Sequence, residues 1–140
     1  MSVQPLPTPN APPVAGPYSP AVRAGDFVVL AGQVGIGANG KLVHGGIEAQ
    51  TAQVLANIEA VLGDIGAGWG DVARTTIFLT DLGNFASVNA LYEGAIGAHR
   101  PARTTIGVAA LPVGAHVEIE CWVYLPDETS PDVVLAEEPT

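Results

Sequence analysis

The chain has 140 residues, which is about one domain, and its composition is 48% hydrophobic and only 14% charged. Its 14 Asp and Glu residues oppose five scattered Lys and Arg residues, and the formal net charge of −9 disfavours nucleic-acid binding, which depends on cations at phosphate groups. No apolar run approaches the roughly 18 residues of a membrane span, and we expect no membrane partner.

The two ends of the chain differ in composition from the middle. Residues 1–13 are rich in Pro and poor in large apolar groups, so we expect a mobile or extended arm. A single folded domain is expected over 14–125, followed by a solvated acidic tail at 126–140. No signal peptide is visible, and the one cysteine, Cys121, cannot form an internal disulfide. Both features favour a cytoplasmic protein.

The first predicted elements are a strand, a turn and a helix. The apolar run Phe27–Ala31, ended by Gly32, predicts a strand that is buried on both faces. Asn39-Gly40 is a strong signal for a hairpin turn. Residues 47–65 carry apolar side chains at helical spacing, and several glycines interrupt the pattern at its end, so we expect a helix there.

A second strand and a second helix follow. Residues 72–80 are rich in β-branched side chains, which favours a strand. Asp81 or Asn84 can cap the next helix. That helix carries one apolar stripe, formed by Phe85, Val88, Leu91, Tyr92 and Ile96.

The chain then predicts two more strands, at 103–108 and at 116–125. The second alternates cleanly, and its apolar face consists of Val117, Ile119, Cys121, Val123 and Leu125. Glu118 and Glu120 therefore point together to the opposite face. Two helices can cover only one face of such a sheet, so we expect the other face to pack against copies of the chain, with a possible ligand site at the subunit boundary.

Arg103 is the leading candidate for a functional residue. In a chain with so few cations it lies in Pro101-Ala102-Arg103-Thr104-Thr105, beside an apolar strand. A guanidinium is suited to bidentate capture of a carboxylate or phosphate, although a structural ion pair with a nearby Glu is the alternative. For Glu118 a functional and a structural role both stay open, whereas Glu120 is interpreted as an exposed surface charge.

Several kinds of chemistry lack support in the sequence. No cluster of Cys and His has the spacing of a metal site, and no Gly-rich dinucleotide turn or P-loop is present. The only lysine, Lys41, follows the Asn-Gly turn and is expected to be exposed, which argues against a Schiff base. No nucleophile-elbow sequence supports a serine triad.

Several segments in order resemble the RidA/YjgF family, also labelled endoribonuclease L-PSP. They are residues 16–21, 30–33, 81–92, 101–105, 110–112 and 117–120. The resemblance covers roughly 14–125 and implies a chorismate-mutase-like α+β fold, with a mixed sheet and two helices on one face. It also implies a homotrimer around a central barrel, with three clefts between subunits.

The resemblance further implies hydrolysis of small, carboxylate-bearing enamines and imines, such as 2-aminoacrylate, to 2-oxo acids and ammonia. It implies no metal and no organic cofactor. By motif position, Arg103 corresponds to the arginine that grips the substrate carboxylate, and Glu118 to the glutamate that positions the attacking water. The remaining positions implied at the substrate cleft are Tyr18, Ala31, Gly32, Asn89 and Thr105.

Two other functions remain as alternatives. Ala31 stands where the family usually has Ser, so a hydroxyl is missing, and this slightly favours a trimer that binds a small ligand or regulates without catalysis. An endoribonuclease is suggested only by the second family label, and the net charge of −9 opposes it.

Overall fold

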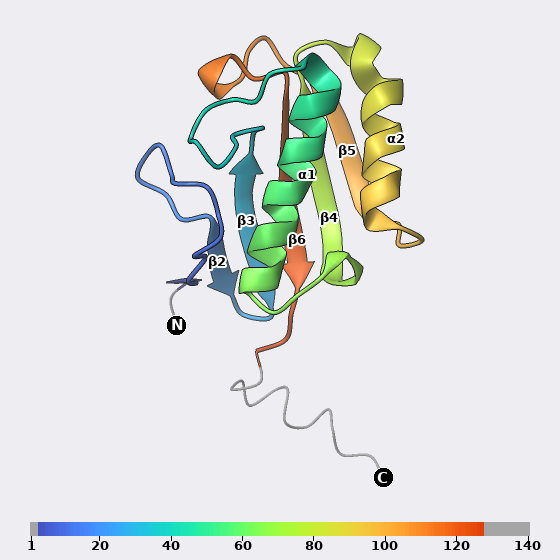
Figure 1. The fold of residues 1–140 in the computed structure, drawn as a ribbon. Coiled ribbons are helices and arrows are strands. Elements are labelled where there is room, and N and C mark those ends of the chain that lie inside the picture. Colours follow the sequence, from blue (N-terminus) through green and yellow to red (C-terminus); the bar gives the residue numbers. More distant parts are fainter. Residues whose placement is uncertain (1–2, 128–140) are drawn as a thin grey trace.

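The computed structural model describes residues 3–127, so nearly all of the expected tail at 126–140 lies outside the described residues. The chain forms one six-stranded sheet in the order β1-β2-β3-β6-β4-β5, with two α-helices (Figure 1). The strands are β1 (Gln4–Pro5), β2 (Ala21–Ala24), β3 (Phe27–Gln33), β4 (Val72–Leu79), β5 (Ala102–Gly107) and β6 (Val117–Tyr124). The helices are α1 (Gly46–Asp64) and α2 (Phe85–Ile96), and short 3₁₀ turns lie at Trp69–Asp71, Leu82–Asn84 and Pro112–Gly114.

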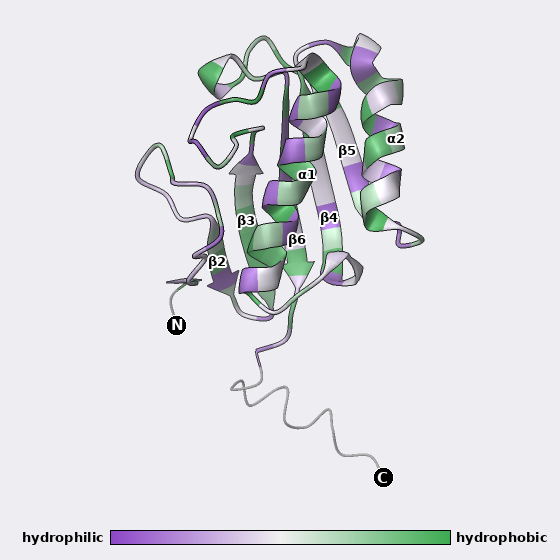
Figure 2. Ribbon diagram, in the orientation of Figure 1, coloured by the Kyte–Doolittle hydropathy of each residue, from purple (hydrophilic) through white to green (hydrophobic). Residues whose placement is uncertain are grey.

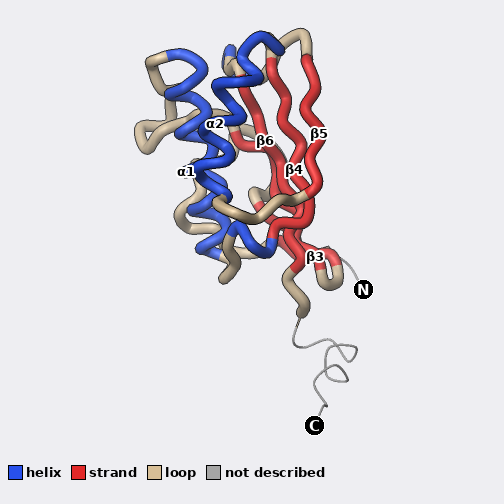
Figure 3. Tube along the Cα trace, turned by 90° about the vertical axis from the view of Figure 1, so that its right-hand side faces the viewer, coloured by secondary structure: helices blue, strands red, loops and turns tan. Residues whose placement is uncertain are grey.

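The sheet is mixed. β4 and β5 are parallel, and every other pair of neighbouring strands is antiparallel. Parallel neighbours need a crossover connection, and α2 supplies it between β4 and β5. Both helices lie on the same side of the sheet, as the rotated view makes plain (Figure 3). The predicted α+β fold, with a mixed sheet covered on one face by two helices, is confirmed.

The core lies between the helices and the inner face of the sheet. From α1, Val54, Ile58 and Val61 are fully buried against this face. Apolar and polar residues are interspersed along both helices (Figure 2). This pattern is typical of helices that pack one side against a sheet and expose the other. Cys121 belongs to this core, and burial, assisted by the charge of Glu120, raises the pKa of its thiol to about 12.

The alternation predicted for β6 is confirmed. Ile119 and Val123 are fully buried, whereas Trp122 and Tyr124 are 45% and 51% exposed on the face without helices. Glu118 lies on that open face as well, because it occupies the other phase of the alternation.

Two expectations near β3 need correction. The prediction that this strand is buried on both faces is wrong for the single chain, because Val28 and Leu30 are buried while Phe27 is 36% exposed on the side without helices. The sequence also failed to predict β2, which pairs with β3 through a two-residue loop that begins at Gly25. Gly25 has a φ of 65°, a conformation that favours glycine.

Two turns also differ in detail from the predictions. Asn39-Gly40 does form a tight turn, but it closes only one isolated bridge, between Ile36 and Leu42, rather than joining two long strands. Asp81 accepts a hydrogen bond from the backbone N–H of Gly83 and so caps the 3₁₀ turn before α2.

The N-terminal arm is extended and is bonded to the domain. β1 pairs with β2, and the N–H of Leu6 donates to the carbonyl of Ala21. Further along, the backbone N–H and the side-chain amide of Asn10 both donate to the carboxylate of Asp64, over 2.8 and 2.6 Å. These contacts fix the path of the arm up to the start of the domain.

Candidate active site

Arg103 lies on β5, the edge strand, opposite Thr75 of β4. Thr75 is fully buried on the helix-covered face, and Arg103 shares that face because paired residues of parallel strands point the same way. Its guanidinium carbon lies 5.4 Å from the ring centroid of Phe85 and 5.1 Å from that of Tyr92. Both rings belong to α2, so the helix provides an aromatic bed for the cation.

The hydrogen-bonding edges of this guanidinium are not used within the described chain. Among residues 3–127 an ion pair joins Arg100 and Glu93, whereas the guanidinium of Arg103 has no hydrogen-bond or ion-pair partner there. The alternative that Arg103 is a structural arginine paired with a Glu of its own chain is therefore not supported. A planar cation stacked on rings, with free N–H groups, is suited to binding a carboxylate.

The bed itself is held in place by a buried hydrogen bond. The hydroxyl of Tyr92 lies 2.7 Å from Oγ1 of Thr75, and the side chain of Tyr92 is only 5% exposed. Burial raises the pKa of the Tyr92 phenol, so the ring stays neutral at physiological pH. The ring thus keeps a fixed orientation below Arg103.

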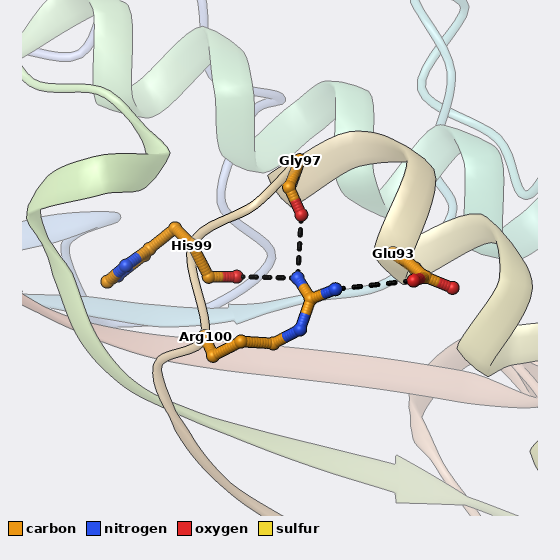
Figure 4. A network of polar contacts seen from close by, with 4 residues as sticks. All are labelled: Glu93, Gly97, His99 and Arg100. Carbon is orange, nitrogen blue, oxygen red and sulfur yellow. Dashed lines mark hydrogen bonds and ion pairs between the residues drawn. The ribbon is translucent and has the colours of Figure 1, made fainter.

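A network of polar contacts fixes the short connection between α2 and β5 (Figure 4). Nη1 of Arg100 donates to the carbonyls of Gly97 and His99 over 2.6 and 2.9 Å, and Nη2 pairs with Glu93 at 3.2 Å. These bonds satisfy two carbonyl groups of the connection just beyond the end of α2. Because the network ends just before β5, it also constrains the strand that carries Arg103.

Arg103 borders an open cavity of about 330 Å³ at this edge of the molecule. Asn89 from α2 lines the same cavity, together with Arg100 and Glu93. Two of the residues implied at the cleft, Arg103 and Asn89, therefore lie together.

Glu118 lies in a second cavity, of about 180 Å³, which it shares with Tyr18 and Gly32. The backbone of β3 is irregular between Leu30 and Gln33, where its pairing with β6 shifts register. A bulge of this kind turns the strand and re-aims its residues. At Gly32 a Cβ atom would collide with the carboxylate of Glu118, so a larger residue there would displace that carboxylate from its present position.

The surroundings of Glu118 favour its protonated form. Burial raises the pKa of its carboxyl, and the negative charge of Glu120 on the same strand raises it further. A carboxyl group with a pKa moved towards neutrality is better suited to accept and return a proton than an exposed one.

The same cavity contains a strained backbone. Val113 lines it and has φ 53° and ψ 25°, a left-handed conformation that is unusual for a β-branched residue. Its side chain is 61% exposed, so no burial compensates for the strain. Strain of this kind is often found at functional sites.

The remaining two implied residues line neither cavity. Ala31 precedes Gly32 in the irregular part of β3. Thr105 lies two residues beyond Arg103 on β5, and its hydroxyl oxygen is buried without a hydrogen-bond partner among the described residues.

Arg103 and Glu118 do not meet within one chain. β4 lies between the strands that carry them, and the two side chains point to opposite faces of the sheet. A site that uses both must therefore draw them from two copies of the chain.

Sequence reasoning assigned Phe85 and Tyr92 only to the apolar stripe of a helix. Their second role, as the bed of Arg103, follows from the packing of α2 beside β5 and has no separate sequence signal. Val113 was also missed, although the Pro-Val-Gly sequence at 112–114 is a turn signal.

Within residues 3–127, no three His, Cys, Asp or Glu side chains come close enough together to hold a metal ion. None of the helices in that part of the chain has the length and apolarity needed to cross a bilayer.

Comparison with known proteins gives a consistent result. The family model described as Endoribonuclease L-PSP matches residues 8–125. A RutC family protein of Pyrococcus horikoshii is 42% identical over 118 residues, which cover 84% of this chain and 94% of that protein. Reactive Intermediate Deaminase A, chloroplastic, of Arabidopsis thaliana is 46% identical over 115 residues, which cover 81% of this chain and 62% of the relative.

Solved structures agree with these matches. The crystal structure of RidA from the Antarctic bacterium Psychrobacter sp. superimposes with a TM-score of 0.83 at 38% identity, and the match covers 87% of this chain and 99% of that one. A putative endoribonuclease L-PSP from Entamoeba histolytica gives a TM-score of 0.85 at 37% identity, over 89% of this chain and all of the other.

Proposed function

The chain belongs to the endoribonuclease L-PSP family, and we propose that it is a hydrolytic deaminase that converts reactive enamines and imines, such as 2-aminoacrylate, to 2-oxo acids and ammonia. The similarity to Reactive Intermediate Deaminase A supports a deaminase-like hydrolase at the level of the family. The observation that carries the proposal is Arg103, a guanidinium held on two aromatic rings with no partner in the described chain.

Arg103 binds the substrate carboxylate in this proposal. Its N–H groups can donate to both carboxylate oxygens, and such a bidentate pair fixes orientation as well as position. Asn89, which lines the same cavity, is placed to contact the substrate beside it.

Glu118 positions water and moves a proton. It takes a proton from the water as the water oxygen bonds to the imine carbon, and it gives that proton to the imine nitrogen, so that a carbinolamine forms. Glu118 then takes the proton of the new hydroxyl group and gives it to the nitrogen, the carbon–nitrogen bond breaks as the carbonyl forms, and the 2-oxo acid and ammonia leave. The raised pKa of Glu118 supports this role, because a carboxylate that binds a proton more readily is a better base for the attacking water than an exposed carboxylate. No step requires a metal or an organic cofactor.

The proposed site lies between subunits, with Arg103 from one chain and Glu118 from another. We further propose a homotrimer, because the sheet face without helices carries an exposed aromatic cluster that a neighbour can cover. Phe27 contacts Trp122 and Tyr124 there, with ring centroids 6.2 and 5.4 Å apart. Light scattering at micromolar concentration should give about three times the monomer mass of 14.2 kDa, and a monomer would contradict the proposed site.

A cytoplasmic location is also part of the proposal. It rests on the single cysteine alone. The relatives give no support for this location, because the name of the Arabidopsis relative places that protein in the chloroplast. The net charge of −9 continues to argue against an RNA substrate.

One assay tests the activity directly. A serine dehydratase generates 2-aminoacrylate, and the release of pyruvate is followed with and without added protein. We expect the protein to accelerate this release in proportion to its concentration. No acceleration, together with retained binding of pyruvate, would favour the alternative of a trimer that binds small ligands without catalysis.

A further inference from the structure

Residues 12–15, where the N-terminal arm joins the domain, form one wall of the cavity that holds Glu118. They are Pro12, Pro13, Val14 and Ala15, and none carries a polar side chain. Further apolar groups from the domain complete the lining, and they include Pro20, Ile36, Pro112 and Val113. Among residues 3–127, Glu118 is the only charged residue that lines this cavity.

The position of this wall depends on a pair of hydrogen bonds at Asn10, two residues before the wall begins. The backbone N–H of Asn10 donates to Oδ2 of Asp64 over 2.8 Å, and the side-chain amide of Asn10 donates to Oδ1 over 2.6 Å. Asp64 is the last residue of α1, so its carboxylate is anchored on the packed body of the domain. Only Ala11, which packs against the core, separates Asn10 from Pro12.

The prolines at 12 and 13 restrict the backbone between this anchor and the cavity. Each proline ring fixes φ of its residue, and each also restricts the residue before it to extended conformations. The segment from Asn10 to Pro13 therefore has few ways to adjust. Its direction is set by the two hydrogen bonds at Asp64.

The chemistry of the proposed reaction places a substrate group against this wall. The reacting carbon carries a carboxylate, a nitrogen and a side chain. The carboxylate is assigned to Arg103 of a neighbouring chain, while water and the departing nitrogen are assigned to Glu118. The side chain then extends into the cavity around Glu118, whose remaining lining is mostly apolar. An anionic side chain would meet the carboxylate of Glu118 instead.

We propose that residues 12–15 form the side-chain subsite of the substrate, that this subsite selects imines with apolar side chains over those with acidic ones, and that Asn10 and Asp64 are positioning residues that fix it. This inference rests on the function proposed above. Neither Asn10 nor Asp64 touches the reacting atoms, so their effect is expected on recognition of the side chain and not on the chemical step.

The test compares three substrates and two stable products. An amino-acid oxidase generates the imines of alanine, leucine and glutamate in the assay, and calorimetry measures the affinities of pyruvate and 4-methyl-2-oxopentanoate. The wild-type protein should prefer the leucine-derived imine over the glutamate-derived one. In Asp64→Ala, KM for the leucine-derived imine should rise about tenfold, the low end of what one methylene contributes in an apolar pocket. KM for the alanine-derived imine and both kcat values should stay within about twofold.

A double variant that exchanges the two side chains provides the rescue. In the double variant Asn10→Asp/Asp64→Asn, the new Asn can accept from the backbone N–H of residue 10 and donate to the new carboxylate, so both bonds can form again. The double variant should recover the wild-type KM for the leucine-derived imine. Asp71→Ala is the matched control, because Asp71 also accepts from a backbone N–H, that of Gly68, but lines none of the cavities described above. It should leave every KM unchanged.

A second variant keeps the test decisive if Asp64→Ala unfolds. Val14 is 42% exposed, so Val14→Asn should be tolerated, and this uncharged polar side chain should weaken binding of 4-methyl-2-oxopentanoate about tenfold while changing that of pyruvate less than about twofold. Equal weakening for both products, or no change for either, would overturn the subsite.

The results also separate this inference from the proposed function. If the protein hydrolyses none of the imines but binds 4-methyl-2-oxopentanoate more tightly than pyruvate, and loses that preference in Val14→Asn, the subsite stands and the deaminase does not. If it hydrolyses the alanine-derived imine but treats leucine-derived and glutamate-derived imines alike, the deaminase stands and the subsite does not.

Discussion

The two cavities of this chain prepare charged groups of opposite sign in opposite ways. On the helix-covered face, Arg103 lies on the rings of Phe85 and Tyr92, with its hydrogen-bonding edges free. On the open face, Glu118 lies over Gly32 in a mostly apolar cavity, where burial raises the pKa of its carboxyl. The first arrangement keeps a permanent charge ready for a ligand, and the second makes a proton easier to hold and to release.

This difference shows why neither cavity is complete. An arginine can bind and orient a carboxylate but cannot exchange protons near neutral pH. A carboxyl with a raised pKa can exchange protons but repels an anionic substrate. The sheet separates the two groups within a chain, so only two chains together provide both capabilities.

The largest effect is expected at Glu118. Gln has nearly the same size and still forms hydrogen bonds, but it cannot carry a proton, so Glu118→Gln should lower kcat by about 10²–10⁴-fold. The affinity for pyruvate should be retained. Glu120→Gln is the control on the same strand and face, and it should change kcat far less.

The stability of Glu118→Gln makes this prediction sharper. A carboxyl whose pKa is raised in the folded protein binds more protons folded than unfolded, so the stability it contributes is present at low pH and is lost as pH rises through the folded pKa. Gln does not ionise, so the variant does not lose this stability as pH rises. The variant should therefore equal or exceed the wild type in Tm at pH 7, with a smaller advantage at pH 4. A fall in Tm and in pyruvate affinity, with kcat retained, would instead make Glu118 a structural partner of an arginine.

The next largest effect is expected at Arg103. Removal of a charged hydrogen-bonding partner typically costs about 2–5 kcal/mol, so Arg103→Ala should lower kcat/KM by roughly 30-fold to several thousand-fold. Arg103→Lys should also be poor, because an ammonium group lacks the planar fork. The fold should persist, because the side chain of Arg103 makes no hydrogen bond or ion pair within residues 3–127.

Lys41→Ala controls for the loss of one positive charge, since Lys41 is exposed and lines neither cavity. Steady-state kinetics and thermal melts on the two variants are sufficient for the comparison. Normal turnover in Arg103→Ala would mean that the carboxylate is anchored elsewhere.

The smallest effect is expected at the strained rim of the Glu118 cavity. Asn tolerates the left-handed conformation that Val113 adopts, and this conformation costs other residues about 1–2 kcal/mol. Val113→Asn should therefore raise the free energy of unfolding by about 1 kcal/mol. Denaturant titration checks this, with the equally exposed Val3→Asn as a control that should bring no gain.

The sequence contained enough information to predict the strand that carries Glu118 and the helix that supports Arg103. The alternation along 116–125 predicted which side Glu118 would face, and the apolar stripe over 85–96 predicted the helix that supports Arg103. These patterns are local, so they could be interpreted without the fold. The motif around Arg103 supplied the rest through its resemblance to a family.

Features that depend on packing between distant segments could not be predicted. β2 was missed because its sequence, Ala-Val-Arg-Ala, has almost no β-branched residues, and its pairing with β3 determines its structure. The role of Gly32 depends on the side chain of Glu118, which is far away in the sequence. The anchoring of Asn10 by Asp64 likewise joins segments 54 residues apart.

The central claim is that one working site takes Arg103 and Glu118 from different chains. Mixing two inactive variants tests it most directly. Arg103→Ala and Glu118→Gln are unfolded together in equal amounts and refolded as mixed oligomers, and the release of pyruvate from 2-aminoacrylate is measured. With random assembly, about one site in four receives its intact Arg103 from one chain and its intact Glu118 from another, so the mixture should regain roughly a quarter of the wild-type activity. A mixture that stays as inactive as either variant alone would contradict the account, because it would place both residues of each site in the same chain.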